Sequence, residues 1–178
     1  MRFQETGLEG LLLIEPAASS DARGYFLRTY CAESFAVHSL NTVWPQTNLS
    51  YTARRGTLRG LHFQKDPAPE IKLIKCMTGR ILDVIVDLRK GSSTYGKWVS
   101  FELSEENHRM LYVPGGFAHG FQCLEDDCRV SYMMSESYVA GLAAGVRWND
   151  PDLCIGWPIA GPLVSQRDAE LPLLTELA

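Results

Sequence analysis

The feature that most constrains the fold of this chain is an alternation of apolar and polar side chains with a period of two residues, repeated in several short segments. Between Gly79 and Gly91, one face carries Leu82, Val84, Val86 and Leu88, and the other carries Asp83 and Asp87. Residues 97–104 and 129–134 alternate in the same way. A period of two is typical of β-strands, and one apolar face per strand is typical of antiparallel sheets packed on one side.

Turn residues separate these segments, and helical signals are few. Glycine, proline, serine or aspartate bounds each alternating run, as expected for strands joined by turns. Short helical patterns occur only within 32–40, in a turn that Ser104 would cap, and in a C-terminal stretch interrupted by Pro172. The pattern predicts an all-β fold with a few short helices: a β-sandwich, jelly roll or barrel. A double-sheet jelly roll would enclose a cavity between its sheets, where inward-pointing side chains can carry out chemistry.

Size and charge limit the classes of protein to consider. The chain has 178 residues, of which 46% are hydrophobic and 21% charged, as in a globular protein. We therefore expect one domain over residues 1–178. Seventeen Lys and Arg against 21 Asp and Glu give a net charge of −4. This balance argues against a binder of nucleic acid or of a membrane surface, although a local basic pocket for a small anion is compatible with it.

The cysteines and the N-terminal residues predict a cytoplasmic protein. The five cysteines are odd in number, and no two have CxxC spacing. They therefore favour reduced, buried thiols over a disulfide framework or a zinc site. The first 16 residues carry three glutamates around a short apolar run, and no stretch has the length of a membrane span.

The densest group of candidate functional residues lies between 45 and 64. One strand face would carry Gln46, Asn48 and Ser50, and another would carry Gly60, His62 and Gln64. On pattern alone, the face with Asn48 and Ser50 is best interpreted as solvent-exposed. Arg59 has the opposite parity to His62, unless a bulge at Gly60 turns both inward. His62 fits a structural histidine and a functional one equally well.

Three more residues occupy unusual places. Lys72 lies on an apolar strand face, where an ammonium group needs a partner, must lose its proton or has to reach water at the end of the sheet. Tyr132 also lies on an apolar face, most simply as a core tyrosine. His119 lies in VPGGFAHGFQ, where three glycines and a proline predict a tight loop that lets the backbone approach a ligand. No nucleotide-binding fingerprint is present, and two histidines without a clear carboxylate make a poor metal site, so we expect no metal.

Several long motifs, taken in order, resemble the dTDP-4-dehydrorhamnose 3,5-epimerase family. The segments are GTLRGLHFQ, KLIKCMTGRILDVIVDLRKGSSTYGKW, LYVPGGFAHGFQCL, WNDPDLCIGWP and SQRDAELPLL. The resemblance extends from about Asp21 to about Leu174. It implies a cupin-like jelly roll, also called a double-stranded β-helix. It also implies action on nucleotide diphosphate-linked 4-keto-6-deoxy sugars, for deoxysugar or polysaccharide synthesis, without a cofactor.

The resemblance assigns four catalytic residues. His62 of the RGLHxQ motif would be the base, and Asp168 of the SxxD motif would orient it. Tyr132 would be the acid, and Lys72 would face the oxyanion. A C4 ketone acidifies the hydrogens on C3 and C5, so a base, an acid across the ring and a cation at the ketone oxygen allow epimerisation through an enolate.

The resemblance also implies a set of substrate contacts. Arg23 of the DxRG motif and Arg59 of the LRGLH motif would hold the diphosphate, and Arg167 would add charge nearby. Further contacts would come from Phe26, Arg28, Gln46, Asn48 and His119, with Tyr138 stacking on the base. After DARG, the family usually has two aromatic residues, an aliphatic one and a glutamate that contacts thymine. Here Tyr25, Phe26 and Leu27 are followed by Arg28, so the identity of the nucleobase stays open.

Several alternatives remain at this point. The enzyme would act at C3 and C5, or at one of them alone, and on a thymidine or another nucleotide. Other classes are a metal-dependent cupin oxygenase and a non-catalytic sugar-nucleotide binding module. The resemblance further implies a homodimer, in which an N-terminal strand joins the neighbour's sheet and Arg23 and Arg28 serve the partner's pocket.

Overall fold

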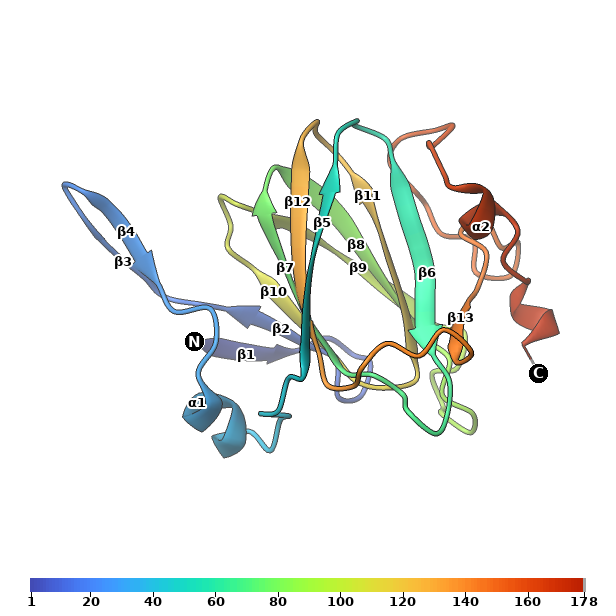
Figure 1. The fold of residues 1–178 in the computed structure, drawn as a ribbon, viewed down its shortest axis with the longest axis horizontal. Helices are drawn as coiled ribbons and strands as arrows, with labels where there is room; N and C mark the ends of the chain where they lie inside the picture. The colour runs from blue at the N-terminus through green and yellow to red at the C-terminus, as the bar shows by residue number, and fades with distance from the viewer. Residues whose placement is uncertain (178) are drawn as a thin grey trace.

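The computed structural model describes residues 1–177 and confirms the predicted all-β, jelly-roll architecture. Two antiparallel sheets face each other, and a two-stranded hairpin stands apart from them (Figure 1). In spatial order, the larger sheet contains β1 (Arg2–Glu5), β2 (Leu12–Glu15), β10 (Met110–Val113), β7 (Lys72–Thr78), β12 (Cys128–Met134) and β5 (Gln46–Thr52). The smaller sheet contains β13 (Ala143–Gly145), β6 (Leu58–Gln64), β11 (Phe117–Cys123), β8 (Arg80–Asp87) and β9 (Trp98–Ser104).

Helical structure is short, as the sequence predicts. It comprises α1 (Ala32–Val37), α2 (Gln166–Ala169) and the 3-10 turn η1 (Leu174–Glu176). Ser104 caps a tight turn, because its hydroxyl accepts a hydrogen bond from the backbone N–H of Asn107 at 3.0 Å. Among residues 1–177, no helix has the length and apolar character that crossing a membrane requires.

Apolar side chains fill three layers. The largest cluster lies between the sheets and includes Ile74, Ile85 and Phe121. A second covers the smaller sheet's outer face with residues of the C-terminal segment. In the third, Phe35 of α1 packs with Tyr112 and other residues of the larger sheet. Both sheets are therefore braced from outside, which holds the space between them at a fixed width.

Strand β8 is buried on both faces. Residues 84 and 86 belong to the outer cluster, while Ile81 and Ile85 belong to the core between the sheets. Asp83 and Asp87 share the parity of the inner face, and both are fully buried. The predicted packing on one side is therefore wrong for this strand, because the C-terminal segment covers the outer face of the sheet.

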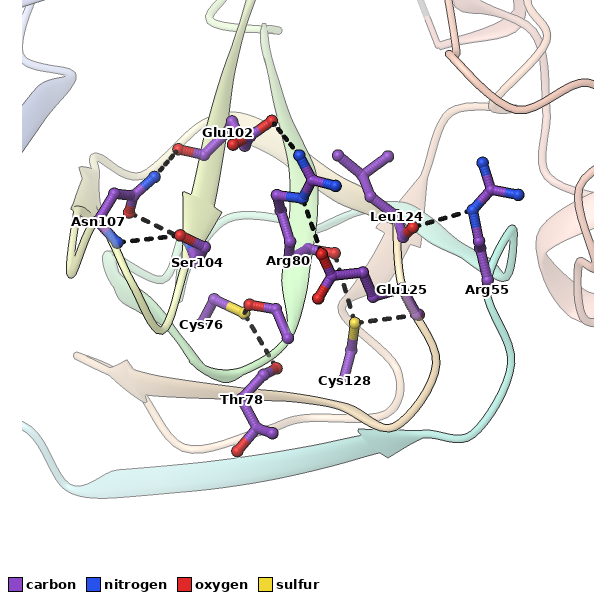
Figure 2. Close-up of polar contacts among 11 residues, drawn as sticks. Arg55, Cys76, Thr78, Arg80, Glu102, Ser104, Asn107, Leu124, Glu125 and Cys128 are labelled. Atoms are coloured by element: carbon purple, nitrogen blue, oxygen red, sulfur yellow. Dashed lines mark hydrogen bonds and ion pairs between the residues drawn. The ribbon is translucent and has the colours of Figure 1, made fainter.

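Turns outside the cavity are held by buried thiols and ion pairs (Figure 2). The Cys76 thiol donates to the carbonyl of Thr78 at 3.3 Å, and the Cys128 thiol donates to the carbonyl of Arg80 at 3.4 Å. The Arg80 side chain pairs with Glu125 at 3.0 Å. All five cysteines are free. Cys76, Cys123 and Cys128 are buried as predicted, but the prediction of burial is wrong for Cys31, which is half-buried, and for Cys154, which is exposed.

The hairpin of β3 (Ala18–Asp21) and β4 (Gly24–Leu27) projects away from the sheets (Figure 1). Its strands pair only with each other among the described residues. Tyr25 and Phe26 are 59% and 69% exposed, and Arg23 pairs with Asp21 of the same hairpin at 2.6 Å. Two exposed aromatic rings on an isolated hairpin are typical of a surface that contacts another molecule.

Candidate active site

A cavity of about 620 Å³ lies between the two sheets. Strands β5, β7 and β12 line it from the larger sheet, β6 and β11 line it from the smaller one, and the segment before and within α2 completes its wall. Of the predicted site residues, the following line it: Gln46, Asn48, Arg59, His62, Lys72, His119, Tyr132, Tyr138, Arg167 and Asp168.

His62 and Asp168 form a hydrogen-bonded pair in this wall. His62 Nε2 lies 2.7 Å from Asp168 Oδ1, and the second carboxylate oxygen accepts the backbone N–H of Gly60 at 3.0 Å. Burial opposes the charge on Asp168, but these hydrogen bonds outweigh burial and lower the pKa of the carboxyl. A carboxylate can only accept here, so the imidazole carries its proton on Nε2. Nδ1 is left as the basic atom.

A bulge in β6 brings Arg59 and His62 to the same cavity. His119 of β11 is opposite His62, but Phe121 is opposite Arg59, so β6 has one extra residue between these pairs. Gly60 lies there with a φ of +121°, and an added Cβ would come within 2.5 Å of the Gly120 Cα. Only glycine fits such a position. The bulge at Gly60, which the sequence pattern left open, is therefore present.

Lys72 has found a partner instead of reaching water. Its Nζ lies 3.0 Å from Oε1 of Glu70 and donates to the carbonyl of His62 at 3.1 Å. The side chains of Lys72 and Glu70 are each only 7% exposed. A charged ammonium group thus lies beside the strand that carries the imidazole.

Tyr132 approaches the cavity from the other sheet. It belongs to β12 of the larger sheet, whereas His62 belongs to β6 of the smaller one. Burial raises the pKa of the Tyr132 phenol, and the positive charge of Arg59 partly offsets this rise. The phenol therefore keeps its proton at neutral pH and is available as a donor.

His119 lies within strand β11, so the prediction of a tight loop at this residue is wrong. It belongs to a second buried pair. Its Nε2 lies 2.9 Å from Oδ2 of Asp83, which is fully buried. Burial raises the pKa of Asp83, while the nearby charges of His119 and Lys72 oppose the rise. The other oxygen, Oδ1, has no hydrogen-bond partner in the described part of the chain.

The polar face of β5 lines the cavity, so its interpretation as solvent-exposed is wrong. Gln46, Asn48 and Ser50 are half-buried, whereas the residues between them point outward. The Gln46 side chain accepts the backbone N–H of Tyr138 at 2.9 Å and donates to Asn48 at 3.3 Å. A polar strand face has the same sequence pattern whether it faces bulk solvent or lines an enclosed cavity.

Arg59 is anchored at the cavity wall. It donates to the Thr52 hydroxyl at 3.0 Å and to the Tyr51 carbonyl at 3.1 Å. With two of its donors engaged, the guanidinium is fixed in place and retains others for an anion. Arg167 lies in α2 and lines the same cavity.

Three predicted site residues lie away from this cavity. Arg23 and Phe26 belong to the projecting hairpin, and Arg28 directly follows it. All three are exposed. Within this chain, the structure does not bring these residues together with the others.

Residues that the sequence analysis left without a role also lie here. Glu70 lines the cavity, and Asp83 supports His119 from behind. Parity on β8 offered a signal for Asp83, because the residue shares a face with buried Ile81 and Ile85. Glu70 lies outside any strand and offered none. Among residues 1–177, no group of three His, Cys, Asp or Glu side chains is arranged to hold a metal.

A family model and a relative of known name identify the same family. The family model described as dTDP-4-dehydrorhamnose 3,5-epimerase matches residues 5–176. The protein of that name from Methanothermobacter thermautotrophicus is 43% identical over 178 residues, which cover 98% of this chain and 95% of that protein.

Solved structures are similar over nearly the whole chain. The Bacillus anthracis dTDP-4-dehydrorhamnose 3,5-epimerase, with TDP and PPi bound, has a TM-score of 0.95 and 45% identity, covering 97% of this chain and 98% of that one. The 3′-monoepimerase ChmJ from Streptomyces bikiniensis, in complex with dTDP-quinovose, has a TM-score of 0.90 and 34% identity, with coverages of 96% and 86%.

Proposed function

Because this chain belongs to the dTDP-4-dehydrorhamnose 3,5-epimerase family and is therefore an epimerase, we propose that it inverts C3, C5 or both in a nucleotide diphosphate-linked 4-keto-6-deoxy sugar. One observation carries the proposal: the His62–Asp168 pair and the Tyr132 phenol enter one cavity from opposing sheets. Inversion needs a base on one face of the sugar ring and a proton donor on the other, which this arrangement supplies.

The first step is removal of a proton next to the ketone. Nδ1 of His62 takes the hydrogen from C3 or C5, and the electron pair of the C–H bond moves toward the C4 oxygen to form an enolate. Asp168 holds the imidazole by Nε2 and stabilises the imidazolium that results. The Lys72 ammonium stabilises the negative charge on the C4 oxygen.

The second step returns a proton to the opposite face. The Tyr132 hydroxyl protonates the carbon as the enolate collapses to the ketone, which inverts the configuration. The tyrosinate then regains a proton and the imidazolium loses one through solvent in the cavity, so the enzyme returns to its starting state with no net change in protons.

The rest of the substrate needs cations and a flat surface. Arg59 and Arg167 are placed in the cavity to hold the diphosphate, where a guanidinium can make paired hydrogen bonds. Gln46, Asn48 and His119 would contact the sugar and the linker. Tyr138, which is 55% exposed, would stack on the nucleobase.

We propose that the protein acts as a homodimer. The hairpin residues Arg23, Phe26 and Arg28 lie outside their own cavity, and Figure 1 shows the hairpin pointing away from the sheets. Reaching into a second copy would bury the exposed Tyr25 and Phe26 rings. It would also bring Arg23 to the diphosphate and Arg28 to the base.

Deuterium incorporation tests the main proposal. The protein is incubated in heavy water with nucleotide-linked 4-keto-6-deoxy sugars, and the substrates are analysed by mass spectrometry. A gain of one deuterium means exchange at one carbon, and a gain of two means exchange at both. His62→Asn, which removes the base, should abolish exchange and leave nucleotide binding near normal. Exchange with none of the sugars would overturn the proposed reaction on 4-keto-6-deoxy sugars.

Mixing two inactive variants tests the dimer. His62→Asn lacks the base, and Arg23→Ala lacks a proposed phosphate contact of the hairpin. If the hairpin acts on the partner subunit, each mixed dimer contains one site with both defects and one intact site, so activity returns. No recovery after confirmed subunit exchange would mean that the hairpin does not complete the partner's cavity.

Epimerisation at one carbon is the second candidate. The similarity to a structure described as a 3′-monoepimerase favours keeping it, because this fold is compatible with single-site chemistry. The number of deuterium atoms incorporated separates the two possibilities.

A further inference from the structure

Glu70 is a buried carboxylate in the cavity wall. It lies in the segment 65–71 between β6 and β7, and its Oε1 is 3.0 Å from the Nζ of Lys72. Its side chain is 7% exposed. Among the described residues, the carboxylate has no other ion-pair partner within 4.0 Å. Lys72 is therefore its ion-pair partner within the described residues.

The segment that carries Glu70 is fixed at both ends. The Gln64 side chain donates to the carbonyl of Ala68 at 2.7 Å. The Ile71 N–H donates to the Ser135 hydroxyl at 2.8 Å, and the Ser135 N–H donates to the Ile71 carbonyl at 3.0 Å. Glu70 thus lies on an anchored segment and not on a free loop, so its carboxylate is held in place before a substrate arrives.

A second buried carboxylate, Asp83, lies within electrostatic reach of the same ammonium. Its Oδ1 has no hydrogen-bond partner among the described residues. If the ammonium moved to Asp83, it would join the His119 pair on the inner wall. With Glu70 present, Lys72 instead bonds to the carbonyl of His62, beside the proposed base.

Resting on the proposed function, we propose that Glu70 is a positioning residue: it holds the Lys72 ammonium next to His62 and aims its remaining N–H at the C4 oxygen. Two of the three ammonium donors are engaged, by Glu70 and by the His62 carbonyl, which leaves one for the substrate. An oxyanion donor is effective only when its position is set in advance.

The variant Glu70→Gln keeps the shape of the side chain and removes its charge. We expect kcat to fall about tenfold, less than the loss of a hundredfold or more expected for removing the oxyanion donor itself. KM and TDP binding should stay within about twofold, since Glu70 does not act on the diphosphate. Glu136→Gln removes an exposed carboxylate from the segment that follows β12 and should leave kcat unchanged.

A double-mutant cycle separates positioning from general structural support. In a Lys72→Met background, Glu70→Gln should cause no further loss of kcat, because its effect passes through the ammonium. Losses that multiply in the double variant would overturn the proposal, as would an unchanged kcat in Glu70→Gln. If Glu70→Gln does not fold, judged by thermal melting, Glu70→Asp takes its place in the same cycle. It keeps the charge and shortens the reach.

The two proposals fail in different ways. If the unmodified protein incorporates no deuterium, the proposed function fails, and the role of Glu70 in that reaction fails with it. If the unmodified protein exchanges and the cycle shows independent effects, the function stands and the role of Glu70 is wrong.

Discussion

Nε2 of His62 lies 2.7 Å from Oδ1 of Asp168, although 106 residues separate them in the chain. The short helix α2 makes this contact possible. Its capping residue Ser165 accepts the Asp168 N–H at 3.1 Å and thereby fixes the backbone that carries the carboxylate. The pair therefore depends on how the C-terminal segment returns across the smaller sheet.

Asp168→Asn tests the orientation of the base. The amide can donate to Nε2, which would move the imidazole proton to Nδ1 and remove the basic atom. We expect kcat to fall about a thousandfold or more with little change in TDP binding. Steady-state kinetics and calorimetry measure both quantities. Asp152→Asn, which removes an exposed carboxylate, serves as the control; a Asp168→Asn enzyme as active as the control would contradict the role of the pair.

Tyr132→Phe tests the separation of acid and base. The imidazole alone can remove a proton and return deuterium on the same face, so exchange should persist within about tenfold. Net inversion should fall about a hundredfold, within the usual contribution of a general acid. Mass spectrometry reports exchange, and NMR coupling constants report configuration. Equal losses of exchange and inversion would assign the phenol a different role.

Arg28→Glu tests the recognition of the nucleobase. A carboxylate can accept a hydrogen bond from thymine N3–H, which a guanidinium cannot, so affinity for TDP should rise about tenfold relative to CDP. Calorimetry with TDP, CDP, UDP and GDP measures the preference. Arg54→Glu makes the same charge change on an exposed residue outside the cavity. A marked preference of the unmodified protein for TDP would show that Arg28 does not exclude thymine.

The free energy of unfolding should depend on pH through Asp87. Burial opposes its charge, but hydrogen bonds from Arg89, Thr94 and Ser92 outweigh burial and hold the pKa of the carboxyl well below 3.8. The folded state thus binds this proton less readily than the unfolded chain. The stabilisation is complete above about pH 5 and is lost as the pH falls below the unfolded value.

The matching variant is Asp87→Asn. At pH 7 it should lower the free energy of unfolding by about 3 kcal/mol, because Arg89 loses its buried partner. Below pH 4 the difference from the unmodified protein should shrink. Urea unfolding at pH 7 and pH 3 measures it, with Asp152→Asn as a control. A difference that does not change between these pH values would mean that Asp87 is not the titrating group.

The strands and much of the cavity wall could be predicted from the sequence. The two-residue period identifies strands such as β8 directly, and glycine at position 60 signals the bulge that turns Arg59 and His62 inward. The period cannot say which face of a strand is covered, because that depends on segments far away in the chain. For this reason, the sequence predicts wrongly that the polar face of β5 is exposed to solvent and that β8 packs on one side only.

Individual partners were harder to predict. No local sequence pattern marks Asp168, and its role was predicted only from the family resemblance. The contact that defines this role joins residues 106 positions apart in the chain. Glu70 lies in an irregular segment where no periodicity assigns a direction to the side chain. Arg23, Phe26 and Arg28 are predicted at a binding site, yet within this chain they lie outside the cavity.

The extra residue in β6 has a consequence for the range of ligands the protein can accept. In the proposed function, Arg59 holds the diphosphate and His62 removes the proton. Both residues lie on β6, so the backbone of one strand sets the spacing of the positions from which they reach the substrate. The proposed function therefore implies that a sugar joined to its nucleoside through a single phosphate reacts more slowly than one joined through a diphosphate.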